Sequence, residues 1–460
     1  MMIPIPTLEA TLARALRSGA DYAELFAEDT LTNYLAMVDG RMEDALSTRI
    51  HGAGVRIFSG TRVLYAYTND TSREGLLRVA GQVADALGEP GAEGELTLHG
   101  TIALNINPVR ILPSTVAGAR KAAAVREVHQ AIAGADPRIV QAQAAFRDVD
   151  QRVLIATSEG PAVEDRRVYS RLIGRATAGN GAENQTGQES PGGLCGLELL
   201  DRVDPGALGR EAARIALTML DAPACPGGRV PVIIDGGFGG VLFHEACAHG
   251  LEATSVARDL SVFCGRLGQR IASERVTAID DGTMPNQWGS FNVDDEGLPG
   301  RRNVLIENGV LKGYMVDRLG ARIMGCEPTG SGRRQSYRYA PTSRMTNTYI
   351  AAGNDDEAEI LSSMPEGLYA KRMGGGSVDT VTGEFNFAVE EGYWVKNGAI
   401  DRPVRGATLI GKGAQVLLDI DRVGKRMWLA QGMCGSKSGS VPTSVGQPMI
   451  RVTAMTVGGR

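Results

Sequence analysis

The sequence predicts an α+β protein, with N-terminal α/β segments followed by a β-rich C-terminal domain. Helix-like and strand-like patterns alternate along the first half of the chain. A segment with two prolines and two glycines interrupts them at 221–228, and two Asn-Gly turns typical of β-hairpins occur in the second half. The length of 460 residues is enough for two or three domains. We expect an N-terminal α/β domain at 1–90, a central α/β domain at 110–222 and a β-rich C-terminal domain at 228–460.

The first expected domain begins with a helix over residues 7–18, where Leu8, Leu12 and Leu16 recur at helical spacing. Its other expected elements are strands near 55–57 and 63–67 joined through Ser59-Gly60, a helix that opens at the capping box Thr71 to Glu74 and ends near Leu87, and a linker at 88–95.

The second expected domain begins near Ile111, and Ser114 is placed to cap an alanine-rich helix that ends near Ala133. Its other expected elements are paired strands at 138–146 and 152–158, a mobile polar loop from Asn180 to Gly193, and a helix at 207–220.

The third expected domain opens with a strand over 230–235, which runs through the glycine-rich stretch 236–240 into a helix that carries His244. After Ser261 we expect mostly β-structure. The turns Asn308-Gly309 and Asn397-Gly398 predict two hairpins there, because Asn-Gly readily adopts the positive φ angles of a type I′ turn.

The composition favours a cytoplasmic globular protein that binds neither nucleic acid nor membrane. The net charge is −5 and the pI about 5.7, without a basic patch interleaved with aromatics. No run approaches the roughly 18 apolar residues of a membrane span, and the N-terminus lacks the basic and apolar regions of a signal peptide. The six cysteines are scattered singly, which suits a reducing compartment and not a disulfide framework.

The most informative motif is His244 and His249 with Glu245 beside the first, in a chain with only five histidines. Neutral imidazole is a common metal ligand, and a Glu next to such a His is the usual general base of a metallopeptidase. In the familiar HExxH helix the two histidines lie four residues apart, about 40° around the axis, whereas five residues correspond to about 140°. A regular helix cannot aim both at one ion, so we expect a π-bulge or a break between Glu245 and His249. The competing interpretation is that two histidines lie near each other by chance on a buried helix.

A catalytic zinc site needs a third protein ligand. Cys434 is one candidate, because it lies in the glycine-rich segment 431–436 and a thiolate binds zinc well. Glu252 is the other, three residues after His249 on the same helix face. An inert buried thiol is the competing interpretation of Cys434. The remaining histidines and two further cysteines have no local partner and are weaker candidates: His51, His99, His129, Cys247 and Cys264.

The run Phe243 to Leu251, FHEACAHGL, resembles the HExxxH motif of the TldD/PmbA family, in particular its TldD branch. The similarity covers nearly the whole chain and is dense from about 230 to 460. Further stretches that agree with the family include Asp280 to Met284, Asp294 to Gly297, Asn303 to Gly309, Gly330 to Arg334, Met345 to Tyr349, Gly406 to Gly411, Gly432 to Gly435, Val445 to Pro448 and Thr456 to Gly459.

The resemblance implies a zinc metallopeptidase that acts on unfolded or extended peptides. It implies ligands at His244, His249 and Cys434, and a catalytic carboxylate at Glu245. It also implies a dimer, either of identical chains or with a PmbA/TldE-like subunit. We expect this dimer to enclose the substrate path, so that unfolded peptides are cut and folded proteins are spared. One local departure is Ala248, where the family often has glycine.

Two groups are candidates for substrate binding. The run Gly374, Gly375 and Gly376 suits the edge along which an extended peptide adds as a strand, or the wall of a tunnel, although a flexible turn is an equally good interpretation. Arg333 and Arg334 could hold a substrate carboxylate or carbonyl, and a solvated turn or an interface ion pair is at least as good an interpretation.

Two other functions compete with a peptidase. A non-catalytic PmbA-like scaffold subunit would share the fold, but that branch typically lacks the metal motif that this chain has intact. A nucleic-acid-associated regulator is suggested by the gyrase-modulator name that the family has carried. The acidic pI argues against direct DNA binding.

Overall fold

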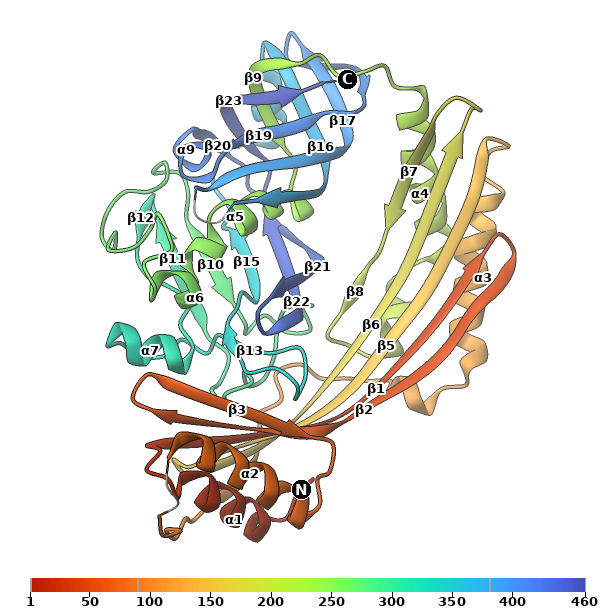
Figure 1. Ribbon diagram of the computed structural model, residues 1–460. Coiled ribbons are helices and arrows are strands. Elements are labelled where there is room, and N and C mark those ends of the chain that lie inside the picture. The colour runs from red at the N-terminus through yellow and green to blue at the C-terminus, as the bar shows by residue number, and fades with distance from the viewer. Residues whose placement is uncertain (1, 89–90, 380–381, 460) are drawn as a thin grey trace.

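The computed structural model describes residues 2–88, 91–379 and 382–459, and it has the predicted α+β class. A long curved sheet with its helices makes up the N-terminal half of the chain, and the β-rich C-terminal part lies against the inner face of this sheet (Figure 1). Within the described residues, no helix combines the length and the apolar character that crossing a membrane requires.

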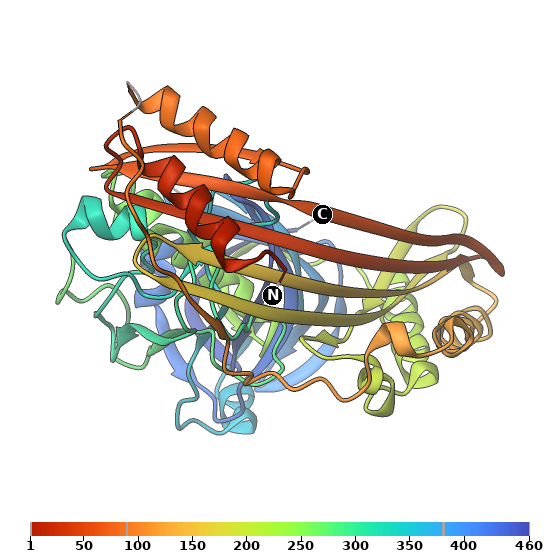
Figure 2. The same ribbon diagram turned by 90° about the horizontal axis from the view of Figure 1, so that it is seen from below.

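The N-terminal half forms one continuous sheet of eight strands in the order β3-β2-β1-β5-β6-β4, and β7 and β8 also pair with β6. Its elements are α1 (Ile5–Leu16), β1 (Tyr22–Val38), β2 (Arg41–Ser59), β3 (Arg62–Thr68), α2 (Arg73–Leu87), β4 (His99–Ile102), η1 (Pro113–Thr115), α3 (Gly118–Ala133), β5 (Ile139–Thr157), β6 (Pro161–Gly179), β7 (Asn184–Glu189), β8 (Gly192–Gly193), η2 (Leu197–Asp201) and α4 (Pro205–Asp221). The long strands β1, β2, β5 and β6 stretch the sheet into a curved band (Figures 1 and 2).

Two pairs of helices cover the outer face of this band. Helices α1 and α2 pack on one end of the sheet and α3 and α4 on the other, each pair over its own cluster of buried apolar side chains (Figure 1). Segments 1–90 and 110–222 thus contribute to one sheet with two apolar clusters. The division of the chain into three domains stays a prediction.

Four expectations for the N-terminal half were wrong in detail. The N-cap of α2 is Ser72 and not Thr71, because the Ser72 side chain accepts the hydrogen bond from the Gly75 amide. Residues 138–146 and 152–158 are parts of the single strand β5, because β1 and β6 pair with it on both sides and supply partners for the polar stretch between them. The expected mobile loop from Asn180 to Gly193 contains β7 and β8, which add to β6. Ser114 lies in the short η1 and does not cap a helix, since α3 begins only at Gly118, without a side-chain cap.

The C-terminal part contains two larger sheets and several short helices. Its elements are β9 (Gly228–Ile234), η3 (Gly237–Gly240), α5 (Val241–Ala246), η4 (Ala248–Leu251), α6 (Ala253–Val256), β10 (Ala278–Asp281), β11 (Arg302–Glu307), β12 (Val310–Leu311), α7 (Arg318–Met324), β13 (Gly332–Arg333), β14 (Thr342–Ser343), β15 (Asn347–Ile350), α8 (Glu357–Ser362), β16 (Glu366–Val378), β17 (Glu384–Lys396), β18 (Ala399–Val404), β19 (Thr408–Lys412), α9 (Gly413–Leu418), β20 (Ile420–Val423), β21 (Trp428–Ser436), β22 (Gly439–Gln447) and β23 (Ile450–Gly458). Both Asn-Gly hairpins are confirmed: Asn308 and Asn397 have φ angles of 48° and 51°.

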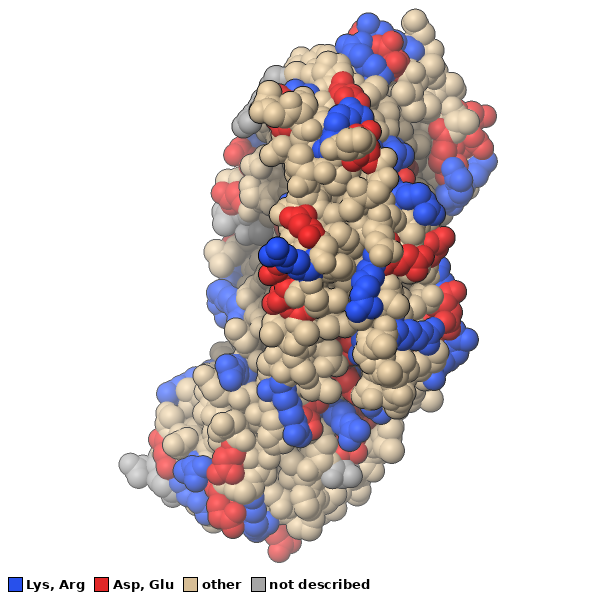
Figure 3. Space-filling view, turned by 90° about the vertical axis from the view of Figure 1, so that its right-hand side faces the viewer, with Lys and Arg blue, Asp and Glu red and all other residues tan. Residues whose placement is uncertain are grey.

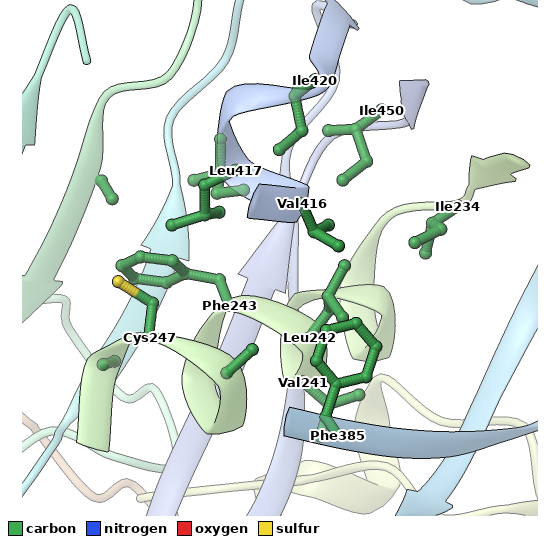
Figure 4. Close-up of a cluster of buried hydrophobic side chains, with 14 of the residues drawn as sticks. Ile234, Val241, Leu242, Phe243, Cys247, Phe385, Val416, Leu417, Ile420 and Ile450 are labelled. Atoms are coloured by element: carbon green, nitrogen blue, oxygen red, sulfur yellow. The ribbon is translucent and has the colours of Figure 1, made fainter. Parts of the chain in front are cut away.

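Helix α5 lies between the two larger sheets of this part. One sheet has the order β12-β11-β10-β15-β22-β21, and the other runs β16-β9-β23-β19-β17-β18, with an extra pairing of β16 with β17 that closes five strands into a barrel. Helix α5 contacts strands of both sheets, among them β15, β16, β17 and β22. The largest apolar cluster of the chain surrounds it (Figure 4). The two sheets therefore fix α5 from both sides.

A buried ionic network joins the inner face of the N-terminal sheet to the C-terminal part. Arg56 on β2 donates to Glu24 on β1 at 2.6 Å and to Glu296 at 2.5 Å, and all three side chains are buried. Arg334 also donates to Glu24, at 2.6 Å. Opposite charges that are paired and hydrogen-bonded in this way avoid the large cost of burying a lone charge. The network therefore holds the two halves in one relative position.

Candidate metal centre

The glycine-rich stretch before α5 brings this helix directly against the backbone of β22. A Cβ atom on Gly240 would lie 2.4 Å from the Gly446 nitrogen, so a larger residue would push the helix away. Strand β22 pairs with β21, which carries Cys434 opposite Val441. The close approach therefore sets the first turn of α5, with His244, beside Cys434.

The helix breaks between the two histidines, as the five-residue spacing predicts. Helix α5 ends at Ala246, Cys247 has φ −134° and ψ −53°, and the 3₁₀ helix η4 begins at Ala248. The irregularity is a break and not a π-bulge. Ala248 does not have a positive φ angle, so this geometry does not require the glycine common in the family. The side chain of Cys247 is buried in the apolar core beside Phe243 (Figure 4).

The break directs both imidazoles toward one sulfur atom. His244 Nε2 and His249 Nε2 each lie 3.3 Å from Cys434 Sγ, and the two rings are nearly perpendicular, with an interplanar angle of 83°. The three donor atoms all lie within 4.8 Å of one another. His244 and Cys434 are buried. The structure thus brings together the three residues that the sequence singled out, and it places Cys434 in strand β21.

This donor set fits a zinc ion. With Zn–S near 2.3 Å and Zn–N near 2.0–2.1 Å, the ligand atoms of a tetrahedral site lie about 3.5 Å from the sulfur, close to the observed spacing. Two imidazoles and one thiolate also leave the fourth position of a tetrahedral ion open, as in catalytic sites. The residues present therefore suit a catalytic metal better than a closed structural one.

Glu252 lies behind His249 and is not one of the three converging donors. Its Oε2 atom is 3.1 Å from His249 Nδ1, on the far side of the ring from Cys434. A carboxylate in this position accepts the Nδ1–H hydrogen bond and leaves the Nε2 lone pair free for a metal. Glu252 thus orients the ring of His249.

Arg344 contacts the backbone of the strand that carries Cys434, and no sequence pattern singled it out. Its guanidinium is fully buried and donates to the carbonyl oxygen of Cys434, to Ser438 Oγ at 3.0 Å and to the Gly439 carbonyl at 2.8 Å. These bonds fix the β21–β22 turn that follows the thiol. An arginine that contacts backbone atoms 90 positions away leaves no local sequence signal.

Burial and charge shift the pKa values of the two histidines in opposite directions. Burial, with His249 and Arg344 nearby, holds the pKa of His244 well below its usual range, so its ring is neutral and able to ligate. Burial alone would also lower the pKa of His249, but Glu252 and then Cys434 raise it well above its usual range. A metal ion would replace the proton that these neighbours favour on His249.

Glu245 stands at the open side of the donor cluster. Its Oε2 atom lies 3.7 Å from His249 Nε2, and its side chain is 29% exposed. Burial raises its pKa above the usual value for a glutamate. It lines a cavity of about 380 Å³ together with His249, Glu252, Thr254, Ser255, Leu260, Val378, Gly435, Ser436 and Lys437. A carboxylate so placed can exchange a proton with a molecule bound between it and the donors.

The glycine run 374–376 lies in strand β16 and not in a turn. The pairing of β16 with β17 is irregular between Met373 and Gly376, so Gly374 and Gly375 form a bulge. Gly375 has open space where a side chain would lie. Met373, before the bulge, lines a cleft of about 1030 Å³, and Val378, after it, lines the cavity at Glu245. The run therefore passes between the two cavities.

Arg333 and Arg334 are buried and do not form a solvated turn. Arg334 pairs with Glu24 in the network between the two halves of the chain, which is the interface interpretation. Arg333 donates to the Met345 carbonyl at 2.6 Å. Neither lines the cavity at Glu245. Both guanidinium groups are buried and have internal partners, and the substrate role expected for Arg333 and Arg334 stays a prediction.

The other histidines and Cys264 lie apart from the donor cluster. His51 Nε2 contacts Thr71 Oγ1 at 2.8 Å, and His129 Nε2 accepts a bond from the Gly40 amide at 2.8 Å. His99 is exposed on β4, and Cys264 Sγ lies 3.6 Å from the Val256 carbonyl oxygen. Among the described residues, only His244, His249 and Cys434 form a group of three or more such donors.

Comparison with known proteins connects this geometry with a family. Residues 23–87, 111–220 and 227–459 match domain 1, the central domain and the C-terminal domain of the PmbA/TldA metallopeptidases. The chain is 35% identical to a metalloprotease TldD homolog of Haemophilus influenzae, over 95% of this chain and 93% of that protein. It is 36% identical to a zinc metalloprotease TldD homolog of Saccharolobus solfataricus over 50% of this chain and 52% of that protein.

The fold agrees with that of a solved relative. The crystal structure of TldE from Thermococcus kodakarensis superposes with a TM-score of 0.77 over 98% of this chain and 100% of that chain, at 17% identity. The match of all three domains and the identity over nearly the full length establish that the chain belongs to the TldD/PmbA family of metallopeptidases.

Proposed function

We propose that this chain is a zinc-dependent metallopeptidase that cleaves unfolded or extended peptides. The observation that carries the proposal is the convergence of His244, His249 and Cys434 beside the partly exposed carboxylate of Glu245. Zinc bound there would supply Lewis acidity to a water molecule and to the scissile carbonyl. The name of the Saccharolobus solfataricus relative agrees with zinc as the metal.

Glu245 is the proposed general base. It would take a proton from the attacking water and deliver it to the leaving amine, which requires a pKa closer to neutrality than that of an ordinary glutamate. Burial raises the pKa in that direction. His249, held by Glu252, keeps its position relative to Glu245 while the proton moves. Glu252 and Arg344 thus act as positioning residues.

Two strands suggest how an extended peptide reaches Glu245. Strand β21 is at the edge of its sheet and pairs there only with β22. Its residues 428–433 line the large cleft, Cys434 is a metal donor, and 435–437 line the cavity at Glu245. Strand β16 also runs from the large cleft to the cavity at Glu245, and Gly374, Gly375 and Gly376 lie between its residues that line the two. We propose that the peptide lies along these strands and binds through backbone hydrogen bonds, which select little for sequence.

The proposed working form is a dimer that encloses this path. Its partner is an identical chain or a PmbA/TldE-like subunit, and the structural similarity to TldE supports the second. In the single chain the cavity at Glu245 opens to solvent, because Gly435, Ser436 and Lys437 on its wall are exposed. A partner that covers this opening would exclude folded proteins and bulk water. An intracellular peptidase needs such protection, and we propose a cytoplasmic location.

Two other functions have less support. A non-catalytic scaffold subunit would not need three donors and a carboxylate in this geometry. A nucleic-acid-associated regulator would need a basic surface, but the net charge is −5, and on the face in Figure 3 Lys and Arg are interspersed with Asp and Glu.

The test compares one protein substrate in two states. The zinc-loaded chain, alone and with a PmbA/TldE-like subunit, is incubated with a compact folded protein and with the same protein reduced and unfolded, and fragments are identified by mass spectrometry. We expect cleavage of the unfolded form only, in fractions that light scattering shows to be dimeric. Glu245→Gln, which keeps the shape but cannot take up a proton, should lose activity by orders of magnitude and keep the metal. Full activity of this variant would remove Glu245 from the base role, and equal cleavage of both substrates or full activity of a monomer would contradict the enclosed path.

A further inference from the structure

Two aliphatic side chains line the cavity at Glu245. Leu260 and Val378 border this space of about 380 Å³ together with the acidic residues Glu245 and Glu252. Leu260 is 52% exposed, although a large aliphatic side chain gains about 1.5–3 kcal/mol from complete burial. Nothing in the described part of the chain covers it. A bound ligand or a partner chain would cover this side chain, whereas single exposed apolar residues elsewhere on a protein surface are common.

The segment that carries Leu260 is held in place by a set of hydrogen bonds. The Leu260 amide donates to the Ser255 carbonyl at 3.0 Å, after Asp259 turns the backbone with a φ angle of 56°. Ser261 Oγ donates to the Gly250 carbonyl at 2.6 Å and accepts from the Phe263 amide at 3.1 Å. Gly250 belongs to η4, which also carries His249. These bonds hold the backbone at Leu260 against η4 and therefore near His249.

Leu260 and Val378 are the two aliphatic side chains among the residues that line the cavity. The Thr254 hydroxyl is hydrogen-bonded to the Ser343 hydroxyl, 2.8 Å away. Glu252 is turned to His249. The volume is at the small end of ligand pockets in proteins, enough for the residues next to a scissile bond and not for a folded segment. Lys437, on the rim, is the one basic side chain in the wall besides His249.

From this arrangement we infer that Leu260 and Val378 form a specificity pocket that selects an aliphatic side chain at a residue flanking the scissile bond. This inference rests on the proposed peptidase function and adds the substrate class to it. The backbone of the peptide would be bound without regard to sequence, and the selection would come from this single contact. Loss of a well-packed apolar contact changes selectivity by about 10-fold or more.

The test uses a substitution that should exchange the preference. A set of peptides identical except for the two residues that flank the cleaved bond is presented to the zinc-loaded chain in its active assembly. Cleavage is followed by mass spectrometry, and binding by fluorescence anisotropy. We expect an aliphatic preference at one flanking position. Leu260→Asp should reduce this aliphatic preference by about 10-fold or more and should favour Lys or Arg at that position. Leu260→Lys should favour Asp or Glu at the same position.

Val262→Asp is the matched control. Val262 is 42% exposed on the same segment but does not line the cavity, so its substitution should leave the preference unchanged. Cleavage without a flanking preference, or an equal effect of both substitutions, would overturn the pocket and leave the peptidase standing. Selective binding that Leu260→Asp reverses, without any cleavage, would support the pocket and contradict the peptidase. Absence of both binding and cleavage would overturn both.

Discussion

Glu252 Oε2 lies 3.1 Å from His249 Nδ1, while His249 Nε2 lies 3.3 Å from Cys434 Sγ. One ring therefore joins an orienting carboxylate to the proposed ion site, and the two candidates for the third ligand occupy different positions. Hydrogen bonds of this kind fix the tautomer and the ring orientation of a ligating histidine.

Glu252→Gln is expected to weaken metal binding without abolishing it. The amide still accepts the Nδ1–H hydrogen bond but removes the negative charge, and such changes behind a ligand typically cost 10–100-fold in affinity. Competition with a chromogenic chelator measures this. Unchanged affinity would mean that Glu252 does not support His249. Complete loss of metal in this variant, with full binding in a Cys434→Ser variant, would make Glu252 the ligand.

Cys434→Ser is expected to lose most of the metal while the fold survives. A serine hydroxyl replaces the thiolate in nearly the same volume, but it is a poor zinc ligand. Metal content by mass spectrometry and thermal unfolding of the metal-free forms give the two readouts. Cys247→Ser is the matched control, because that thiol is buried in the core and should lose stability but keep the metal. Full occupancy in Cys434→Ser would exclude Cys434 as a ligand.

Arg334→Met is expected to destabilise the fold by about 3 kcal/mol, because it leaves the buried Glu24 with one fewer cation. Denaturant unfolding of the metal-free chain measures the change. The exposed pair of Arg138 with Asp221 offers a control whose loss should have little effect. If Arg334→Met left stability unchanged and weakened peptide binding instead, this result would support the predicted substrate role of Arg334.

Asp317→Asn is expected to gain stability relative to the unchanged chain as the pH rises. Burial and then the neighbouring Glu296 raise the pKa of Asp317 to about 7, so its contribution is fully present below pH about 4 and is lost as the pH rises to about 7. Asparagine stays neutral and still caps α7 by accepting from the Gly320 amide. The difference in melting temperature should grow between pH 4 and 7 and stay level above pH 8. A difference independent of pH would contradict the raised pKa.

The sequence predicted the parts of the site that depend on local geometry. The five-residue spacing of His244 and His249 is incompatible with a shared ion on a regular helix and predicted a π-bulge or a break between Glu245 and His249. The structure has a break, at Cys247. The two Asn-Gly hairpins were predicted equally well, because the turn type depends on two adjacent residues.

Features that depend on distant partners could not be predicted in this way. The polar middle of β5 reads as a loop until β1 and β6 are known to flank it. Arg344 contacts backbone carbonyls in another strand, and Arg334 is paired with a glutamate 310 positions away. Leu260 reads as an ordinary apolar residue, and its exposure beside Glu245 is visible only in three dimensions.

The most direct test of the metal centre is X-ray absorption at the zinc edge of the reconstituted full chain. We predict a first shell with one sulfur at about 2.3 Å and two nitrogen donors at about 2.0–2.1 Å, completed by one light atom from solvent. That result requires His244, His249 and Cys434 to share one ion. A shell of nitrogen and oxygen alone, or one with two sulfur atoms, would contradict the site.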